Sequence, residues 1–152
     1  MVPLLQNAAQ TLGVSPKTLL AHAALETGWG RSVVGNNIFG IKAGASWSGA
    51  RVVAPTHEIE NGQSVAQLAA FRAYPSLGAA VQDYVSLISQ RYRNAQGIGE
   101  DARKYGEALI AGGYATDTDY PGKLQAVAAS AQMAAAFAGA NPSMQPIKLV
   151  NW

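Results

Sequence analysis

The spacing of apolar residues changes period twice along the chain, and this change limits the folds that the chain can adopt. Helical spacing runs over residues 4–26, strand-like alternation over residues 51–74, and helical spacing returns after Ser76. The alternating stretch is interrupted at Asn61-Gly62, the strongest short signal for a hairpin turn. We therefore expect a mainly α (α+β) fold in which one small β-hairpin interrupts a set of helices.

Two helices are expected before residue 28, joined by a tight turn. Gly13 ends the first, and Ser15-Pro16 is a typical N-cap and first-turn pair for the second. The first helix carries its apolar stripe at Leu4, Leu5, Ala8 and Leu12. The stripe of the second consists of Leu19, His22, Ala23 and Glu26, so Glu26 is expected to face the same way as the apolar side chains.

Three more helices are expected in the C-terminal half. Ser76 is the expected N-cap of the first, whose stripe consists of Leu77, Val81, Tyr84 and Ile88. The second runs from about Glu100 to Gly112-Gly113. A loop over residues 114–120 leads into a single last helix, for which Asp119 is the expected N-cap and whose apolar positions are Leu124, Val127, Ala128, Ala131 and Ala135.

The length and composition predict one domain with its own core. The chain has 152 residues, of which 49% are hydrophobic and 13% charged. We expect this domain to span residues 1–140. Residues 141–152, which contain Pro142 and Pro146, are expected to form a loose C-terminal tail.

The composition also argues against several classes of protein. The absence of cysteine excludes disulfides, thiolate metal sites and a thiol nucleophile. The net charge is +2 and the Lys and Arg residues are scattered, whereas a protein that tracks nucleic-acid phosphates normally shows a basic patch. No apolar run approaches the roughly 20 residues of a membrane span. We therefore expect neither nucleic-acid binding nor a membrane span.

Residues 28–49 lack helical spacing and are interrupted by six glycines. A loop of this length inside a compact domain is usually functional. Trp29, Phe39 and Trp47 give it aromatic faces, on which sugar rings can stack.

Glu26 is the carboxylate with the most distinctive setting. It lies where a helical pattern stops, among apolar residues and directly before Gly28, Trp29 and Gly30. A carboxyl group among apolar side chains resists ionising, and the negative end of a helix dipole adds to this effect. Glu26 is therefore a candidate general acid. On this segment alone, a solvated glutamate before a glycine C-cap explains the pattern equally well.

A second set of carboxylates lies in the predicted hairpin. Alternation places Thr56, Glu58 and Glu60 on one face, and His57 and Ile59 on the other. Glycoside hydrolysis uses one carboxylic acid to protonate the leaving oxygen and usually a second carboxylate. Either glutamate of the hairpin could serve with Glu26 if the fold brings them together. The alternative is a solvated strand face.

The chain shows no pattern that calls for a metal or a cofactor. His22 and His57 stand alone, without a ligand-spaced partner. Asp117-Thr118-Asp119 begins like a calcium loop, but Tyr120-Pro121 follows where further oxygen ligands are needed. Tyr114 has loop packing as its default role, as does Tyr120, although a tyrosine hydroxyl can also hold water or a substrate amide.

Five motifs occur in order along most of the chain: Ala23-Ala24-Leu25-Glu26-Thr27-Gly28-Trp29-Gly30, Asn37-Ile38-Phe39-Gly40-Ile41-Lys42, Thr56-His57-Glu58-Ile59-Glu60-Asn61-Gly62, Phe71-Arg72-Ala73-Tyr74 and Gly113-Tyr114-Ala115-Thr116-Asp117. Together they resemble the peptidoglycan hydrolases of glycoside hydrolase family 73, and most of all its flagellar members. Five ordered motifs are far more specific than any one of them.

The resemblance implies a lysozyme-like helical domain with a small β-hairpin lobe flanking a substrate cleft. It also implies endo-β-N-acetylglucosaminidase action on β-1,4 bonds of the peptidoglycan glycan strands. Glu26 matches the acid of the family, Glu58 its second glutamate and Tyr114 its tyrosine, so these are the expected catalytic residues. The residues expected to shape the groove are Trp29, Asn37, Phe39 and Tyr120. No metal or cofactor is implied.

The chain departs from the family pattern at several positions. His22 stands where we expect Gln, Ile38 replaces the usual Leu, and the loop between Gly30 and Asn37 is short, which bears on groove width. Two other functions are also open. One is a lytic transglycosylase with Glu26 as its single acid/base, and the other is a non-catalytic module that binds cell wall.

The resemblance further implies a periplasmic or wall-associated protein. Residues 1–6 show no signal peptide, so the export route is not visible in the chain. In flagellar members a rod-scaffolding half precedes this domain. A role in clearing wall for flagellar rod assembly, with rod proteins as partners through that missing region, therefore rests on similarity. A free-standing or phage-type wall hydrolase is the alternative.

Overall fold

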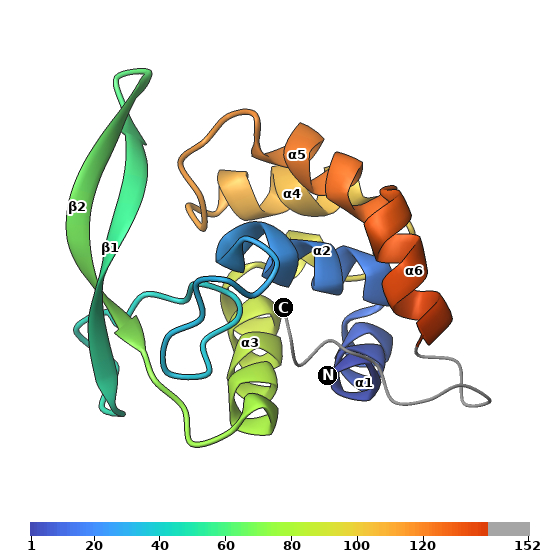
Figure 1. The fold of residues 1–152 in the computed structure, drawn as a ribbon, viewed down its shortest axis with the longest axis horizontal. Helices are drawn as coiled ribbons and strands as arrows, with labels where there is room; N and C mark the ends of the chain where they lie inside the picture. The colour runs from blue at the N-terminus through green and yellow to red at the C-terminus, as the bar shows by residue number, and fades with distance from the viewer. Residues whose placement is uncertain (140–152) are drawn as a thin grey trace.

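The computed structural model describes residues 1–139, which form a helical body and a separate hairpin (Figure 1). The helices are α1 (Val2–Leu12), α2 (Pro16–Thr27), α3 (Leu77–Arg91), the 3-10 turn η1 (Arg93–Ala95), α4 (Ala102–Ala111), α5 (Tyr120–Ala128) and α6 (Ala131–Gly139). The strands are β1 (Arg51–Glu60) and β2 (Gln63–Arg72). The mainly α fold with one hairpin is confirmed. The tail expected over residues 141–152 lies outside the described residues.

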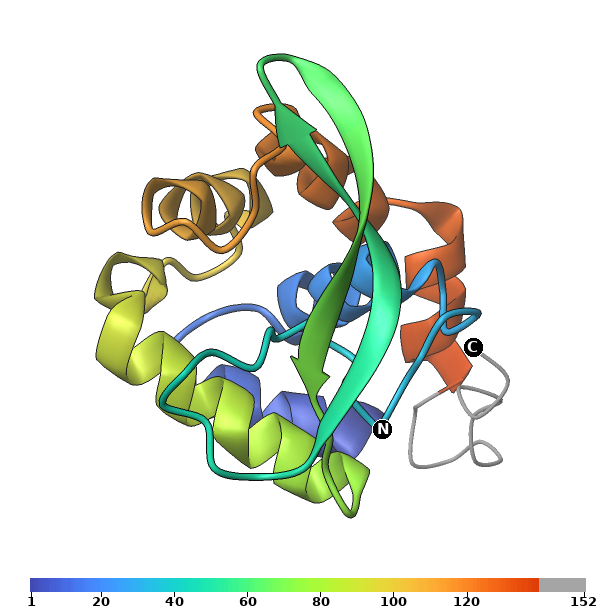
Figure 2. The ribbon, with the colours of Figure 1, turned by 90° about the vertical axis from the view of Figure 1, so that its left-hand side faces the viewer.

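The two strands form an antiparallel ribbon that stands away from the helices. Register pairs Arg51 with Arg72 at one end and Glu60 with Gln63 at the other. Asn61 and Gly62 form the two-residue turn, and both have positive φ, at 51° and 78°, which matches the twist of the flanking strands. The ribbon is strongly twisted and crosses in front of the helices when the molecule is viewed from its side (Figure 2).

Helix α2 lies at the centre of the helical body. It contacts α1, α5 and α6, while α3 packs on α1 and α4 packs on α5 (Figure 1). A run of five residues, Leu19, Leu20, Ala21, His22 and Ala23, has no exposed surface at all. The expected stripe of α2 is therefore confirmed, but burial extends around the helix over residues 18–24. The central position explains why even the polar side chains of Thr18 and His22 are enclosed.

Side-chain caps set several helix starts as expected. The Ser15 hydroxyl accepts from the Lys17 backbone N–H at 3.2 Å, and the Ser76 hydroxyl accepts from Ala79 N–H at 3.1 Å. Helix α4 begins at a cap from Asp101, whose Oδ1 accepts from Lys104 N–H at 3.0 Å.

In α1 the expected stripe is wrong at Leu4, which is 36% exposed, because α1 turns Val2 and Leu5 toward the core instead.

The single last helix that the sequence predicts is divided in two. The break falls at Ala129 and Ser130, because the Ser130 hydroxyl accepts from Met133 N–H at 3.1 Å and so caps a new helix. The same hydroxyl donates to the Val127 carbonyl at 2.7 Å, which lies at the end of α5. The new helix direction buries Met133 completely. Asp119 stands at the N-cap position of α5, as expected, but makes no side-chain capping bond there.

No helix within residues 1–139 is long and apolar enough to cross a bilayer.

The contact between α4 and α5 is close enough to predict a stability effect. A Cβ added at Gly106 would lie 2.8 Å from Pro121 Cα, so Gly106→Ala must push the two helices apart. We expect a loss of about 1–3 kcal/mol in the free energy of unfolding, measured by urea denaturation. Gly122→Ala is the matched control, because it also replaces a helical glycine but its Cβ has no neighbour nearer than Arg103 Nη2 at 3.6 Å. It should be neutral or stabilise by up to about 1 kcal/mol. Equal losses in both variants would contradict the close packing.

Candidate active site

Glu26 lies in the last turn of α2, at the point where the chain leaves the helical body. The helix ends because Gly28 adopts the left-handed conformation and Trp29 N–H bonds back to the Ala24 carbonyl at 2.8 Å. The Glu26 side chain is 24% exposed, so it is enclosed on most sides without being sealed from solvent. Tyr120, at the start of α5, donates its hydroxyl to Glu26 Oε1 at 3.0 Å.

The second oxygen of Glu26 faces the long loop. A Cβ added at Gly40 would lie 2.7 Å from Glu26 Oε2, and Gly40 has a φ of +63°. Both the space and the backbone conformation therefore require glycine at this position. Oε1 is therefore the oxygen that accepts from Tyr120, and Oε2 is the oxygen that lies beside the loop.

His22 lies one helical turn before Glu26 and is completely buried. Its Nδ1 is 2.7 Å from the Tyr84 hydroxyl, which in turn shares a short hydrogen bond with the Tyr105 hydroxyl. Its Nε2 is 3.6 Å from Glu26 Oε1. Within residues 1–139, this Nε2 makes no hydrogen bond although it is buried. One ring nitrogen is thus anchored in the core and the other is directed at the carboxylate.

Aromatic rings enclose His22 on several sides. The nearest ring centroids belong to Tyr114 at 4.8 Å, Tyr84 at 5.4 Å and Phe39 at 5.5 Å. Phe39 also stacks on Tyr84 with centroids 3.7 Å apart. This packing places the loop of residues 28–50 directly over the end of α2.

The tyrosines beside Glu26 are neutral hydrogen-bond donors. Burial raises the pKa of the Tyr120 hydroxyl well above its ordinary value of 10.0, and the nearby charge of Glu26 raises it further. The pKa of the Tyr114 hydroxyl is raised for the same two reasons, again with burial first. Tyr114 donates to the Phe39 carbonyl at 2.7 Å. Both hydroxyls therefore keep their protons throughout the physiological pH range.

Glu58 projects from β1 toward the helical body and is held by groups from two other segments. Lys42, in the long loop, forms an ion pair with Glu58 Oε1. Thr116, in the loop between α4 and α5, donates its hydroxyl to Glu58 Oε2 at 3.0 Å and accepts from Ile59 N–H at 3.0 Å. The Glu58 side chain is 15% exposed. These contacts tie the hairpin to the loop that also carries Tyr114.

Glu26 and Glu58 line the same cleft. Its larger segment has a volume of about 310 Å³ and lies between the end of α2, β1 and the loop before α5. A smaller adjoining segment of about 220 Å³ continues past Glu58 toward the end of α3. Residues shared by both segments are Gly40, Lys42, Glu58, Tyr114 and Thr116. A chain-like ligand can therefore pass both carboxylates in one continuous groove.

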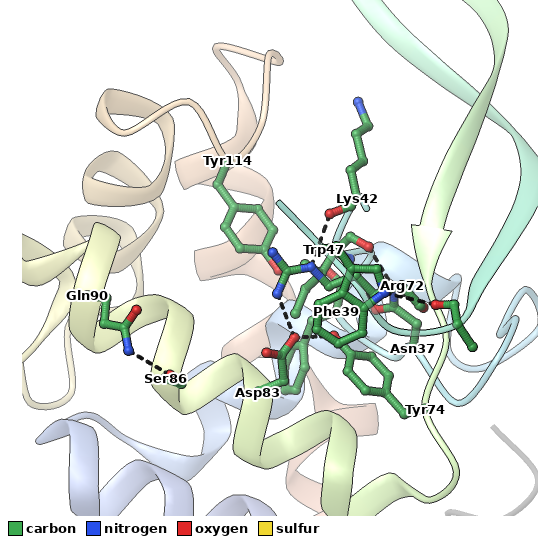
Figure 3. Close-up of polar contacts among 12 residues, drawn as sticks. Asn37, Phe39, Lys42, Trp47, Arg72, Tyr74, Asp83, Ser86, Gln90 and Tyr114 are labelled. Atoms are coloured by element: carbon green, nitrogen blue, oxygen red, sulfur yellow. Dashed lines mark hydrogen bonds and ion pairs between the residues drawn. The ribbon is translucent and has the colours of Figure 1, made fainter. Parts of the chain in front are cut away.

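A polar cluster on the far side of the loop supports this wall of the cleft (Figure 3). Arg72 donates to Asp83 on α3 at 2.9 Å and also to the Lys42 carbonyl at 3.3 Å, while its guanidinium lies 4.5 Å from the centre of the Trp47 ring. Tyr74 donates to the same Asp83 carboxylate. The cluster joins the end of β2 to α3 and fixes the backbone next to Lys42.

Two of the four residues expected to shape the groove are buried behind its surface. Asn37 is buried and bonds to the Ile41 and Arg72 carbonyls, each at 2.8 Å, so its amide holds the loop together. Phe39 is fully buried. Trp29 packs against the core and does not line either cleft segment. Tyr120 does line the larger segment. Asn37 and Phe39 therefore support the groove from behind, whereas a substrate contact by Trp29 or Tyr120 stays a prediction.

The three expected catalytic residues are all at the cleft, since Tyr114 lines both segments with Glu58. Glu60 is exposed near the hairpin tip and lines neither segment, because the ribbon carries it beyond the helical body. Sequence reasoning missed Lys42, Thr116 and the contact of His22 with Glu26. Lys42 and Thr116 lie inside the recognised motifs and His22 directly precedes the first of them, but nothing in their spacing indicates that they meet a glutamate.

The described residues include no group of three or more His, Asp or Glu side chains that could hold a metal ion. Asp117, which begins the calcium-like segment, instead forms an ion pair with Lys123.

Comparison with known proteins gives a consistent family match. The family model described as glucosaminidase, mannosyl-glycoprotein endo-beta-N-acetylglucosaminidase, matches residues 2–133. The peptidoglycan hydrolase FlgJ of Pseudomonas aeruginosa is 40% identical over 93% of this chain, which spans 38% of that protein. The exo-glucosaminidase LytG of Bacillus subtilis is 30% identical over 90% of this chain and is matched over 50% of its own length. The chain thus spans half or less of these curated relatives.

Solved structures agree with the sequence match. A peptidoglycan hydrolase from Sphingomonas sp. A1 is 36% identical and superposes with a TM-score of 0.82, covering 96% of this chain and 94% of that one. The glycoside hydrolase domain of Salmonella typhimurium FlgJ is 30% identical with a TM-score of 0.66, covering 98% and 92%. The lysozyme-like arrangement expected from the motifs is therefore confirmed.

The contact between Gly40 and Glu26 predicts a displacement that can be observed directly. Gly40→Ala places a methyl group against Oε2, so the Glu26 side chain must swing away and lose its bond from Tyr120. Gly62→Ala is the matched control, because it also has positive φ, at +78°, but nothing lies within 4 Å of its Cβ. Both variants should lose about 1–2 kcal/mol through backbone strain. Crystal structures should show a displaced carboxylate in Gly40→Ala alone, and an unmoved Glu26 there would refute the contact.

Proposed function

The chain belongs to the glucosaminidase family, and from this premise we propose that it hydrolyses β-1,4 glycosidic bonds of peptidoglycan glycan strands, with Glu26 as the general acid. The observation that carries the proposal is the cleft in which Glu26 and Glu58 face a common groove from opposite lobes. Two carboxylates across one groove are the arrangement that most glycoside hydrolases use. The names of the relatives, peptidoglycan hydrolase and glucosaminidase, support the substrate class.

The two oxygens of Glu26 have different surroundings, which suits proton transfer. Oε1 accepts from the neutral Tyr120 hydroxyl and faces His22, so the transferable proton belongs on Oε2, beside Gly40. As that proton passes to the glycosidic oxygen, negative charge grows on the carboxylate. The hydrogen bond from Tyr120 to Oε1 is therefore stronger in the transition state than in the ground state, and this difference lowers the barrier.

Glu58 is proposed to act on the other side of the bond. Its carboxylate is oriented by Lys42 and Thr116, so it is positioned rather than free to swing. From there it can orient the attacking water or stabilise the positive charge that develops on the sugar. Tyr114 lies between the two acids, because it lines both cleft segments while its hydroxyl donates to the Phe39 carbonyl.

Replacement of Glu26 tests the acid directly. Glu26→Gln keeps the size of the side chain but removes the proton, so the digestion rate of purified sacculi should fall by at least about 10²-fold. Glu60→Gln is the matched control, since Glu60 lies outside the cleft, and it should digest at the wild-type rate. Turbidity of sacculi over time measures both. Undiminished digestion by Glu26→Gln would show that another group donates the proton.

The products separate hydrolysis from the alternatives. Mass spectrometry of the digest should show new reducing N-acetylglucosamine ends and a strong loss of rate in Glu58→Gln. Products ending in 1,6-anhydromuramic acid, formed without dependence on Glu58, would establish a lytic transglycosylase. Binding to sacculi without any soluble fragment would establish a non-catalytic module.

His22 is proposed as a positioning residue for Glu26. His22→Phe keeps a buried ring but removes the nitrogen that faces Oε1, so kcat should fall about tenfold with KM unchanged, the effect of one lost polar contact. His22→Gln restores a polar group and should recover most of kcat. Thermal unfolding measured in parallel shows whether either variant is merely unstable. Wild-type kcat in a stable His22→Phe variant would remove His22 from the mechanism.

The cellular setting is proposed on the same basis. A peptidoglycan hydrolase acts outside the cytoplasm, in the periplasm or at the cell wall, so we infer export by a route that this chain does not reveal. The similarity to FlgJ proteins supports a role in opening the wall for the flagellar rod, with rod proteins as partners. A motility assay with the Glu26→Gln allele in the native gene tests this role, and normal flagellation there would argue for another wall-remodelling task.

A further inference from the structure

The smaller cleft segment carries a positive charge that the proposed hydrolysis does not use. Four charged residues line it, namely Lys42, Glu58, Arg72 and Arg91. Lys42 is paired with Glu58, and Arg72 is paired with Asp83 behind the wall. Within residues 1–139, no carboxylate pairs with Arg91. Arg91 is therefore the uncompensated cation of this part of the groove.

The position of Arg91 distinguishes it from an ordinary surface arginine. It lies in the last turn of α3, where a cation also complements the helix dipole. Arg93 follows two residues later and is also exposed, but it does not line the cleft. The dipole accounts for a basic residue near this helix end. The dipole does not explain why Arg91, and not Arg93, lies in the wall of the groove that leads to Glu58.

The substrate class supplies the matching group. The sugar rings of a glycan strand offer hydroxyl and amide groups, whereas the lactyl-linked peptides that peptidoglycan strands carry are acidic. A guanidinium group with its two-pronged donor geometry is well suited to a carboxylate. The segment has a volume of about 220 Å³, which is less than a whole small-molecule pocket and suits one branch of a larger ligand.

On the basis of the proposed function, we propose that the segment beyond Glu58 binds a carboxylate of the peptide borne by the glycan strand, with Arg91 as its partner. The two cleft segments share Gly40, Lys42, Glu58, Tyr114 and Thr116, so a strand held between the acids places its side branch next to Arg91. Tyr92 and Leu87 supply apolar walls for the peptide in the same segment. The site thereby favours peptide-bearing strands over bare glycan.

The test compares two substrates that differ in the peptide alone. Glycan strands from sacculi are used as isolated and after an amidase has removed their peptides and the lactyl carboxylates thus freed have been converted to neutral amides, and kcat/KM is measured on each. Arg91→Ala should lower kcat/KM about fivefold on peptide-bearing strands and leave it unchanged on bare strands. The deficit should shrink in high salt, because an exposed ion pair is screened. Arg91→Lys keeps the charge and should recover part of the loss.

Arg93→Ala is the matched control and should equal the wild type on both substrates. The proposal is overturned if Arg91→Ala affects both substrates equally or neither, if Arg93→Ala reproduces its effect, or if the wild type cleaves both substrates with equal kcat/KM. Failure of the proposed function looks different, because the wild type would then cleave neither substrate or would release products ending in 1,6-anhydromuramic acid. Thermal unfolding of each variant confirms that a loss of activity is not a loss of folded protein.

Discussion

The hydrogen bond from Tyr120 to Glu26 joins residues that are 94 positions apart, and the rest of the site depends on the packing that brings them together. Tyr120 is held at the start of α5, whose approach to α4 is close enough to exclude a methyl group at Gly106. Glu26 is held by the end of α2, the helix at the centre of the body. Because both ends of the bond are fixed by helix packing, the carboxylate is oriented before any substrate arrives, and this preorganisation is the property that catalysis needs.

The second carboxylate is positioned in a different way. Glu58 lies on a two-stranded ribbon, an element that has marginal stability alone. Its place across the groove comes from Lys42 and Thr116, which belong to two loops of the helical lobe. The Arg72–Asp83 pair holds the base of the same ribbon against α3. The groove therefore has one wall set by core packing and one set by polar contacts, and the second is the wall better able to move when a strand enters.

Sequence reasoning was most successful where a local rule applies and least successful where contacts are distant. The hairpin turn, the caps at Ser15 and Ser76 and the end of α2 follow from neighbouring residues, and all are confirmed. The split between α5 and α6 was missed, because the hydroxyl of Ser130 competes locally with an otherwise continuous helical pattern. Motif membership correctly brought Glu26, Glu58 and Tyr114 to one cleft. It did not show that Asn37 and Phe39 serve as supports behind the surface, since their residue types suit a groove equally well.

The chain by itself determined the period changes, the helix ends, the hairpin register and the identity of two candidate acids, because these depend on side chains close in sequence. Tertiary structure decided which oxygen of Glu26 meets Tyr120, that His22 turns a nitrogen toward it, and that Lys42 and Thr116 hold Glu58. Those contacts join segments separated by loops whose paths no local pattern specifies. A groove with an acid on each side is therefore a property of the packed molecule, although each acid can be recognised in the sequence.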